Sequence, residues 1–366
     1  MDIGQIDRNF AAEQVDYEGM ETYHLPMAPF EIRGLFSAVP GDYKRLPDDV
    51  AGQCNDSLRA MYVCPSGGRI RFRTDSRRII LKADEPDLMP NPHHAFTGGQ
   101  CFDLYSDGGF VNSFRPDTSG RGEHVRRKDL YIAHGYDAII RFPTRKMREI
   151  LIYFPLYSRV DEVWIALEKD AFSAPPTPYS LDTPFVFYGT SITQGGCVSH
   201  PGNNYPAILS RWLDSDFLNL GFSDGGRGEL AMAEYISTLP MSALVLDYDA
   251  NARGAEGLKQ TFEPFYRTVR KRQPDVPILM VSAVSRLPGN DLEARRKVIR
   301  DIYETAVAEG DRNVRFLNGE TVFAPYGGAD YCTVDGLHVN DLGAYAFAKA
   351  AEPILSEMLN AKSTNA

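Results

Sequence analysis

The second half of the chain alternates short apolar runs with segments of helical periodicity, and this alternation constrains the fold more than any other feature. The apolar runs are residues 185–188, 217–220, 243–246, 278–281 and 314–317. Between them, segments such as 257–272 and 292–308 place apolar residues at steps of three and four, as does the closing segment 342–359. Strands joined by crossover helices form parallel sheets covered on both faces. The pattern therefore predicts a flavodoxin-like, three-layer α/β/α domain with a parallel five-stranded sheet.

The first half has a different rhythm, in which short strand candidates are separated by turn residues. The candidates are residues 69–74, 78–82, 137–142 and 149–154. Alternating apolar positions with frequent Gly, Pro, Asn and Asp are typical of antiparallel sandwiches. We therefore predict an all-β, jelly-roll-like sandwich domain over residues 1–172.

A proline-rich segment separates the two halves. Prolines occupy positions 175, 176, 178 and 184, where they remove backbone donors and stiffen the chain. A chain of 366 residues with 43% hydrophobic content is large enough to bury two cores. The sequence thus predicts a linker at residues 173–183 and a second domain at residues 184–366.

Charge and cysteine content exclude several classes of protein. The formal net charge of -10 argues against a nucleic-acid partner, so the basic clusters 126–128 and 270–272 are expected to be solvated faces. No stretch is long and apolar enough to span a bilayer, and the acidic amino terminus does not resemble a secretory signal. The five cysteines are scattered and lack Cys-x-x-Cys spacing, which favours reduced thiols. We therefore expect a cytoplasmic protein without membrane partners.

Ser191 lies in a glycine-rich turn directly after the first apolar run. The residues Gly189-Thr190-Ser191 end that run and lead into a short helical segment. Such a turn holds a hydroxyl at the carboxyl end of a parallel sheet, where α/β enzymes place their chemistry. Taken alone, a turn or helix-cap serine is an equal interpretation. Together with the residues below, Ser191 is a candidate nucleophile.

A histidine and an acid lie far downstream on the last long loop. Asp335 precedes His338 by three residues, so one loop can supply a general base and the group that orients it. The imidazole would accept the serine proton and return it to the leaving alcohol, while the carboxylate would set the tautomer. Asp330 is a rival acid and His200 a rival base. We favour Asp335 because it is nearer in sequence, and we expect a substrate-lining or surface role for His200.

Two further candidates follow the second and third apolar runs. Attack on an ester carbonyl places negative charge on its oxygen, which the backbone N–H groups of Ser191 and Gly221 and the side-chain amide of Asn251 can stabilise. Loss of one such donor typically costs about 3 to 4 kcal/mol of transition-state stabilisation. Gly221 could instead merely turn the chain, and Asn251 merely cap it. Asp247 and Asp249 could help to bind substrate or support the Asn251 loop, and we favour support.

The second half resembles a known hydrolase family. Gly189-Thr190-Ser191, Gly221, Asn251 and Asp335-x-x-His338 resemble, in order, the four blocks of the SGNH (GDSL-like) hydrolases. The resemblance implies a catalytic triad of Ser191, His338 and Asp335, and an oxyanion hole formed by Ser191, Gly221 and Asn251. It also implies a metal-independent esterase or acylhydrolase that needs no cofactor. The chain departs from the family by Thr190 in the first block and by alanines on both sides of Asn251.

The first half resembles the GxDLY-type amino-terminal domain that accompanies one branch of these esterases. The resemblance rests on Arg45-Leu46-Pro47, on 101–105 and on 153–157, with Cys101 in place of the motif's glycine. This branch is similar to carbohydrate esterases that carry a β-sandwich in front.

We therefore expect a serine esterase that cleaves a short acyl ester of a small molecule or carbohydrate, such as an O-acetyl group, through an acyl-enzyme. Acyl transfer to an alcohol, or carbohydrate binding by an inactive hydrolase domain, are the alternatives. His93, His94 and Trp164 are candidates for sugar contact, with loop exposure or core packing an equal interpretation. Cys197 is expected to pack rather than react. A homo-oligomer is compatible with the sequence.

Overall fold

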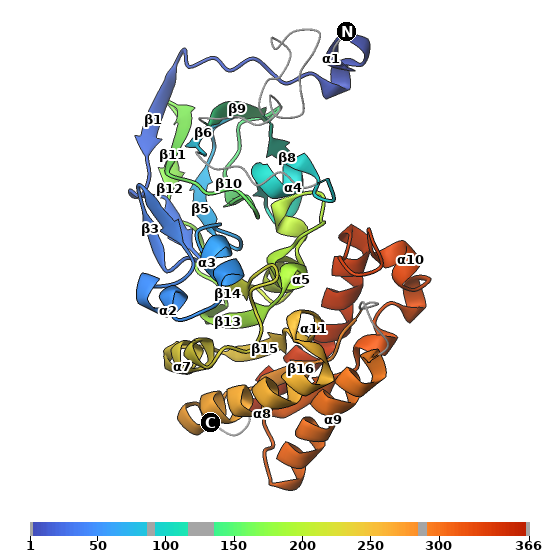
Figure 1. Ribbon diagram of the computed structural model, residues 1–366. Helices are drawn as coiled ribbons and strands as arrows, with labels where there is room; N and C mark the ends of the chain where they lie inside the picture. The colour runs from blue at the N-terminus through green and yellow to red at the C-terminus, as the bar shows by residue number, and fades with distance from the viewer. Residues whose placement is uncertain (1–2, 86–91, 116–134, 285–290, 364–366) are drawn as a thin grey trace.

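The computed structural model describes residues 3–85, 92–115, 135–284 and 291–363. An antiparallel β-sandwich precedes a five-stranded parallel sheet that has helices on both faces (Figure 1). Both predicted architectures are confirmed. The basic cluster 126–128 lies outside the described residues.

The elements of the first half are α1 (Ile3–Ile6), η1 (Arg8–Phe10), β1 (Met20–His24), β2 (Glu31–Arg33), β3 (Ser37–Val39), β4 (Asp42–Lys44), α2 (Asp48–Gly52), α3 (Asp56–Met61), β5 (Arg69–Thr74), β6 (Arg78–Asp84), α4 (Phe96–Gln100), β7 (Phe102–Ser106), β8 (Gly109–Phe114), β9 (Tyr136–Arg141), β10 (Arg148–Tyr153), β11 (Glu162–Glu168) and β12 (Ser173–Ala174). Those of the second half are β13 (Leu181–Gly189), α5 (Ser191–Gln194), η3 (Pro201–Asn203), α6 (Tyr205–Trp212), β14 (Ser215–Gly221), α7 (Leu230–Thr238), β15 (Ala243–Asp247), η4 (Asp249–Asn251), α8 (Gly254–Arg272), β16 (Ile278–Val281), α9 (Leu292–Ala308), β17 (Val314–Leu317), η5 (Gly319–Thr321), η6 (Ala324–Tyr326), α10 (Ala329–Cys332) and α11 (Asp341–Ser363).

The sandwich buries its core between two antiparallel sheets. One sheet has the order β1-β11-β6-β9, and the other runs β12-β5-β10-β7-β8 with β2 also paired to β5. Phe72 on β5 and Leu81 on β6 are fully buried in the same hydrophobic cluster, so the inward positions of the two sheets pack together. The linker predicted at 173–183 stays a prediction, although its first two residues form the edge strand β12.

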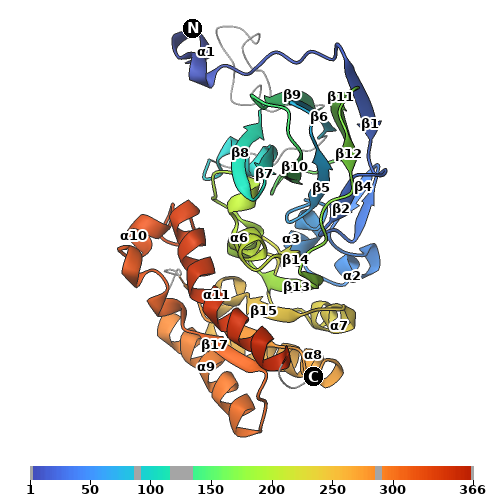
Figure 2. The ribbon, with the colours of Figure 1, turned by 180° about the vertical axis from the view of Figure 1, so that it is seen from behind.

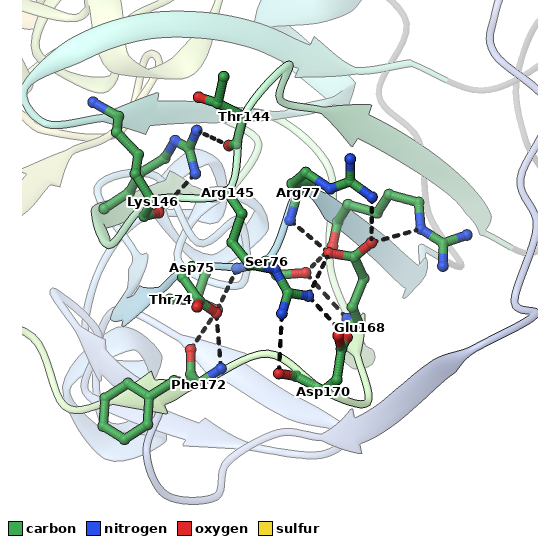
Figure 3. A network of polar contacts seen from close by, with 12 residues as sticks. Thr74, Asp75, Ser76, Arg77, Thr144, Arg145, Lys146, Glu168, Asp170 and Phe172 are labelled. Carbon is green, nitrogen blue, oxygen red and sulfur yellow. Dashed lines mark hydrogen bonds and ion pairs between the residues drawn. The ribbon is translucent and has the colours of Figure 1, made fainter.

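A charged network joins the connections at one end of the sandwich (Figure 3). Glu168, at the end of β11, accepts hydrogen bonds from the backbone nitrogen of Arg77 at 2.8 Å and from the guanidinium groups of Arg78 at 3.3 Å and Arg145 at 3.4 Å. Burial raises the pKa of Glu168, but these hydrogen bonds outweigh it and hold the pKa below its usual value. The carboxylate therefore ties the β5–β6 turn and the β9–β10 connection to β11.

The parallel sheet has the strand order β14-β13-β15-β16-β17. Helix α6 packs against α11 on one face, while α7, α8 and α9 pack in succession on the other (Figures 1 and 2). Residues 185–188 of β13 are all fully buried, which explains their continuous apolar sequence. The carboxyl ends of β13, β14 and β15 lie side by side, so the candidate residues that follow them share one edge of the sheet.

The two halves are joined by a shared hydrophobic core rather than by a linker alone. Leu46, Leu58, Met61 and Leu156 from the first half are buried in the same cluster as the strands of the parallel sheet. The sequence alone led us to expect two separate cores, because local patterns do not show packing between halves. None of the helices in the described ranges combines the length and apolarity needed to cross a membrane.

Candidate active site

Ser191 begins a one-turn helix at the end of β13. The Thr190 hydroxyl accepts a hydrogen bond from the Ile192 nitrogen at 3.1 Å and so caps α5. The carbonyl of Ser191 accepts from the nitrogens of Gly195 and Gly196 at 2.9 and 2.8 Å, and Gly195 ends the helix with a φ of 104°. Ser191 is 8% exposed, and its own N–H, at the start of the helix, has no acceptor among the described residues. The turn thus presents a hydroxyl and an unused backbone donor together.

A buried carboxylate anchors this helix to the neighbouring strand. Asp247, at the end of β15, accepts hydrogen bonds from the hydroxyl groups of Thr193 at 3.0 Å and Tyr205 at 3.2 Å. Burial raises the pKa of Asp247 to about 7. Asp247 thus supports the helix that begins at Ser191, whereas the sequence led us to expect it to support the Asn251 loop.

The loop that carries Asn251 is held in a similar way. Asp249 accepts from the backbone nitrogen of Ala283 at 2.8 Å and pairs with Arg295 at 3.2 Å. The Arg295 guanidinium also donates to the carbonyls of Asp249 at 2.6 Å and Ala252 at 2.8 Å, on both sides of Asn251. The loop is therefore fixed before any substrate binds.

Asp335 and His338 form the pair that the sequence predicts. Asp335 Oδ2 lies 2.7 Å from His338 Nδ1, and Asp335 Oδ1 accepts from the backbone nitrogens of His338 at 2.7 Å and Leu337 at 3.0 Å. Burial raises the pKa of Asp335, but these hydrogen bonds outweigh it and lower the pKa to about 2. Because the carboxylate is an anion, Nδ1 carries the proton and Nε2 of the neutral ring can accept one.

The imidazole lies against the end of the serine's helix. A Cβ atom added at Gly196 would be 3.3 Å from the carbonyl oxygen of Ser191 and 3.6 Å from His338 Cδ2, the ring carbon next to Nε2. Within the described part of the chain, no hydrogen bond joins the Ser191 hydroxyl to His338. Catalytic hydrogen bonds are often long in unliganded enzymes and shorten when substrate binds. The structure thus places the His338 loop next to the helix that begins at Ser191, without a hydrogen bond between the two side chains in the described residues.

Gly221 requires a correction. Its N–H donates to the Asn219 side-chain oxygen at 2.9 Å, so this donor is already used. A Cβ atom at Gly221 would lie 2.4 Å from the nitrogen of Gln194 and 2.7 Å from Thr193 Cβ. Glycine is needed here because β14 packs directly against α5, and the predicted oxyanion contact of its N–H is not available.

The turn after Gly221 holds a donor that sequence reasoning missed. Asp224 adopts a φ of 52°, and the turn is closed by the Gly225 nitrogen donating to the Phe222 carbonyl at 3.0 Å. The Asp224 N–H has no acceptor among the residues that the structure describes. Asn251 Nδ2 donates to the same Phe222 carbonyl at 3.1 Å, so the amide lies beside this turn with a second N–H to offer. Asp followed by two glycines was the available signal, since Asp tolerates this backbone region.

The first half also contributes side chains to this region. His93 Nε2 lies 3.7 Å from Asp335 Oδ2, and the Tyr157 hydroxyl lies 2.5 Å from the Ser223 hydroxyl. The His94 ring is 4.1 Å from the Tyr157 ring, and burial, assisted by His338 and His93, lowers the pKa of His94 to about 4. His93 and His94 therefore lie beside the loops that carry the candidate catalytic residues.

The remaining candidates lie elsewhere or are inert. Trp164 stacks against His24 at 5.0 Å and under Lys82 at 4.5 Å, on strands of the sandwich. His200 is not a surface residue, because its Nδ1 lies 2.6 Å from the buried Asp103 Oδ2 and joins the two halves. Burial raises the pKa of the Cys197 thiol to about 12, in agreement with packing.

All five cysteines are described, and none forms a disulfide. Over the described ranges, no group of three or more His, Cys, Asp or Glu is arranged to hold a metal ion.

Two family models match the sequence. Residues 182–356 match the GDSL-like lipase/acylhydrolase family, and residues 23–172 match the GxDLY domain, described as the N-terminus of SGNH-hydrolase-type esterases. No curated protein matches the sequence significantly.

Solved structures are similar over nearly the whole chain. A protein described as a GDSL-like lipase from Bacteroides ovatus is 25% identical, with a TM-score of 0.79 over 93% of this chain and 98% of its own. A salicylyl-acyltransferase from a tetracycline biosynthetic pathway is 19% identical, with a TM-score of 0.73 over 93% and 98%. A family two carbohydrate esterase from Clostridium thermocellum is 15% identical, with a TM-score of 0.58 over 81% of this chain and 93% of its own. The similarities to the acyltransferase and to the carbohydrate esterase show the fold alone. Residues 182–356 therefore belong to the GDSL-like lipase/acylhydrolase family, and residues 23–172 form the GxDLY-type domain that precedes esterases of the SGNH hydrolase type.

Proposed function

We propose that this protein is a serine esterase that removes a short acyl group, such as an O-acetyl group of a carbohydrate, through an acyl-enzyme. The observation that carries the proposal is the Asp335–His338 pair, whose imidazole lies against the helix that begins at Ser191. Because Asp335 occupies Nδ1, Nε2 is the ring nitrogen left to accept a proton. A strand-end serine with such a base is suited to acyl transfer.

In the proposed mechanism, Ser191 Oγ forms a bond to the ester carbonyl carbon while its proton moves to His338 Nε2. The carbonyl oxygen becomes an oxyanion, which the N–H groups of Ser191 and Asp224 and the second amide hydrogen of Asn251 stabilise. The bond to the leaving alcohol then breaks, and the alcohol takes the proton from Nε2. Water repeats the sequence on the acyl-enzyme, and Asp335 stabilises the imidazolium in both steps.

Two observations support the choice of substrate. Ser191 is only 8% exposed, and His93, His94 and Tyr157 from the sandwich domain lie around the catalytic loops, which favours a short acyl group. Proteins of this fold include a carbohydrate esterase described in complex with cellohexaose and an acetyl xylan esterase from a rumen bacterium. The proposal extends this substrate class to the present chain.

The test measures hydrolysis of nitrophenyl acetate, a long-chain nitrophenyl ester and an acetylated oligosaccharide by wild type and Ser191→Ala. We expect turnover of the acetyl esters by wild type, weaker turnover of the long-chain ester, and no turnover by the variant. A fluorophosphonate should label Ser191 and not the nearby Ser223, as read by peptide mass spectrometry. Equal turnover by Ser191→Ala would refute the mechanism.

The same triad supports acyl transfer to an alcohol, as in the acyltransferase of similar fold. Product analysis with added alcohols separates the two reactions, because a transferase forms a new ester where an esterase releases the free acid. Glycan binding without any labelling of Ser191 would instead indicate an inactive hydrolase domain.

A further inference from the structure

A buried arginine from the sandwich domain contacts the loop that contains Asp224. Arg45 is 2% exposed, and its Nη1 donates to the carbonyls of Gly221 at 2.5 Å and Asn219 at 3.1 Å. Its Nη2 donates to the carbonyl of Met61 at 2.7 Å. The guanidinium carbon also lies 4.3 Å from the centre of the Phe222 ring, over its face. Arg45 thus contacts three of the residues that end β14 and begin the following turn.

Among the residues that the structure describes, no carboxylate pairs with Arg45. Burial lowers the pKa of Arg45 to about 10, so the guanidinium stays charged at neutral pH. The titratable groups that act on it are the thiol of Cys64 and the phenol of Tyr157, and neither is a carboxylate. Burying an unpaired cation is unfavourable unless its donors are used. The contacts to the backbone carbonyls are therefore what stabilise Arg45 in this place.

Hydrogen bonds connect Arg45 to the strand of the nucleophile. The Gly221 carbonyl accepts from Arg45, and the Phe222 N–H of the same peptide group donates to the Gly189 carbonyl at 3.1 Å. A hydrogen bond at a carbonyl polarises its peptide group and strengthens the N–H on the other side. Gly189 is the last residue of β13, and Ser191 follows two residues later. Arg45 therefore holds the end of β14 against the end of β13.

We propose that Arg45 is a positioning residue for ester hydrolysis, which holds the Asp224 turn at the distance from Ser191 that oxyanion stabilisation requires. The inference rests on the proposed esterase function. It assigns the GxDLY-type domain a role in positioning the oxyanion donors, because the guanidinium reaches the end of β14 from the first half of the chain. A shift of about 1 Å in such a donor can lower the rate by about 100-fold.

The experiment compares Arg45→Lys with Arg69→Lys. Arg69 is a matched control because it too is fully buried at the contact between the two halves, where it pairs with Asp216 and donates to the Phe217 carbonyl at 3.1 Å. Those contacts lie at the beginning of β14, at the opposite end of the strand from Gly221. Both substitutions keep a positive charge and remove the planar fork.

We expect Arg45→Lys to lower kcat about 10- to 100-fold with KM changed less than about twofold. Arg69→Lys should change kcat less than about threefold, even if its melting temperature falls as far as that of Arg45→Lys. Arg45→Met should lower kcat further than Arg45→Lys. Equal losses of kcat in the two lysine variants, or a loss confined to KM, would overturn the proposal.

Hydrogen exchange read by mass spectrometry gives a measurement that does not depend on ester turnover. Peptides covering 219–226 and 187–192 should exchange faster in Arg45→Lys than in wild type, and at the wild-type rate in Arg69→Lys. Unchanged exchange in Arg45→Lys would overturn the placement of Arg45. Absence of wild-type ester turnover would instead refute the proposed function, while the exchange rates would still decide whether Arg45 holds the turn.

Discussion

Replacing Asp335 with asparagine reverses one hydrogen bond in the candidate site, while the shape of the side chain stays nearly the same. The Oδ1 atom of either side chain can accept from the nitrogens of His338 and Leu337, which lie at 2.7 and 3.0 Å in the wild type. At the other position, asparagine presents an N–H₂ donor to His338 Nδ1, where Asp335 presents an acceptor at 2.7 Å. The ring must then carry its proton on Nε2, the atom that has to accept the proton of Ser191.

The expected loss is large in activity and small in stability. A wrong tautomer lowers kcat/KM by about 10³- to 10⁴-fold, which corresponds to about 4 to 5.5 kcal/mol of transition-state stabilisation. Two of the three hydrogen bonds to the Asp335 side chain persist in the variant, so the loop should remain in place. We therefore expect KM to change little and the melting temperature to fall by only a few degrees.

The assay is hydrolysis of nitrophenyl acetate by wild type, Asp335→Asn and the control Asp330→Asn, which alters the rival acid on α10. The control should retain wild-type kcat/KM, because the acid bonded to His338 is Asp335. Because the pKa of Asp335 is lowered to about 2, its carboxylate becomes protonated only as the pH falls toward that value. The pH profile of wild-type kcat/KM near neutral pH should therefore show no change due to titration of Asp335. Retention of more than about a tenth of the activity by Asp335→Asn would refute the tautomer argument.

Three further predictions follow from contacts in the structure. Gly221→Ala should lower the free energy of unfolding by about 1 to 3 kcal/mol in urea denaturation, because the added Cβ would lie 2.4 Å from the Gln194 nitrogen. The control Gly52→Ala should not lower it, because nothing lies within 4 Å of the Cβ added there. Asn251→Ala should lower kcat about 100- to 1000-fold with less change in KM, as measured by steady-state kinetics, and an effect on KM alone would contradict its role as an oxyanion donor. Glu168→Gln should destabilise the fold by about 1 to 3 kcal/mol at neutral pH. Because the pKa of Glu168 is held below its usual value, the difference from wild type should disappear in denaturation at pH values below that pKa, and a constant difference would contradict the reasoning.

The regular elements of the second half follow closely from the sequence. The predicted runs 278–281 and 314–317 coincide with β16 and β17, and 292–308 coincides with α9. Strand β13 begins earlier than the apolar run, at Leu181, and its pairing with β14 is irregular between Leu181 and Phe185. Pro184 lies in this interval and cannot donate to a neighbouring strand, which is why the local pattern suggested a later start.

The Asp335–His338 pair could be predicted because its geometry is local, whereas the candidate oxyanion donors could not. Asp335 and His338 are three residues apart, so a single turn brings carboxylate and imidazole together. Whether a backbone N–H is free depends on every acceptor around it. Gly221 donates to Asn219 two residues away, while the Asp224 donor depends on a turn with positive φ.

By itself, the sequence determined the two fold classes, the order of the candidate residues along the strands and the local Asp335–His338 pair. Hydrophobic periodicity and short sequence spacings are enough to predict these features, because each feature depends on residues that are close together in the sequence. Only the tertiary structure decided that His93, Tyr157 and Arg45 lie among the loops of the candidate site. Such contacts join residues more than sixty positions apart. They form because burial of a shared core brings the two halves together, and no local sequence pattern contains that information.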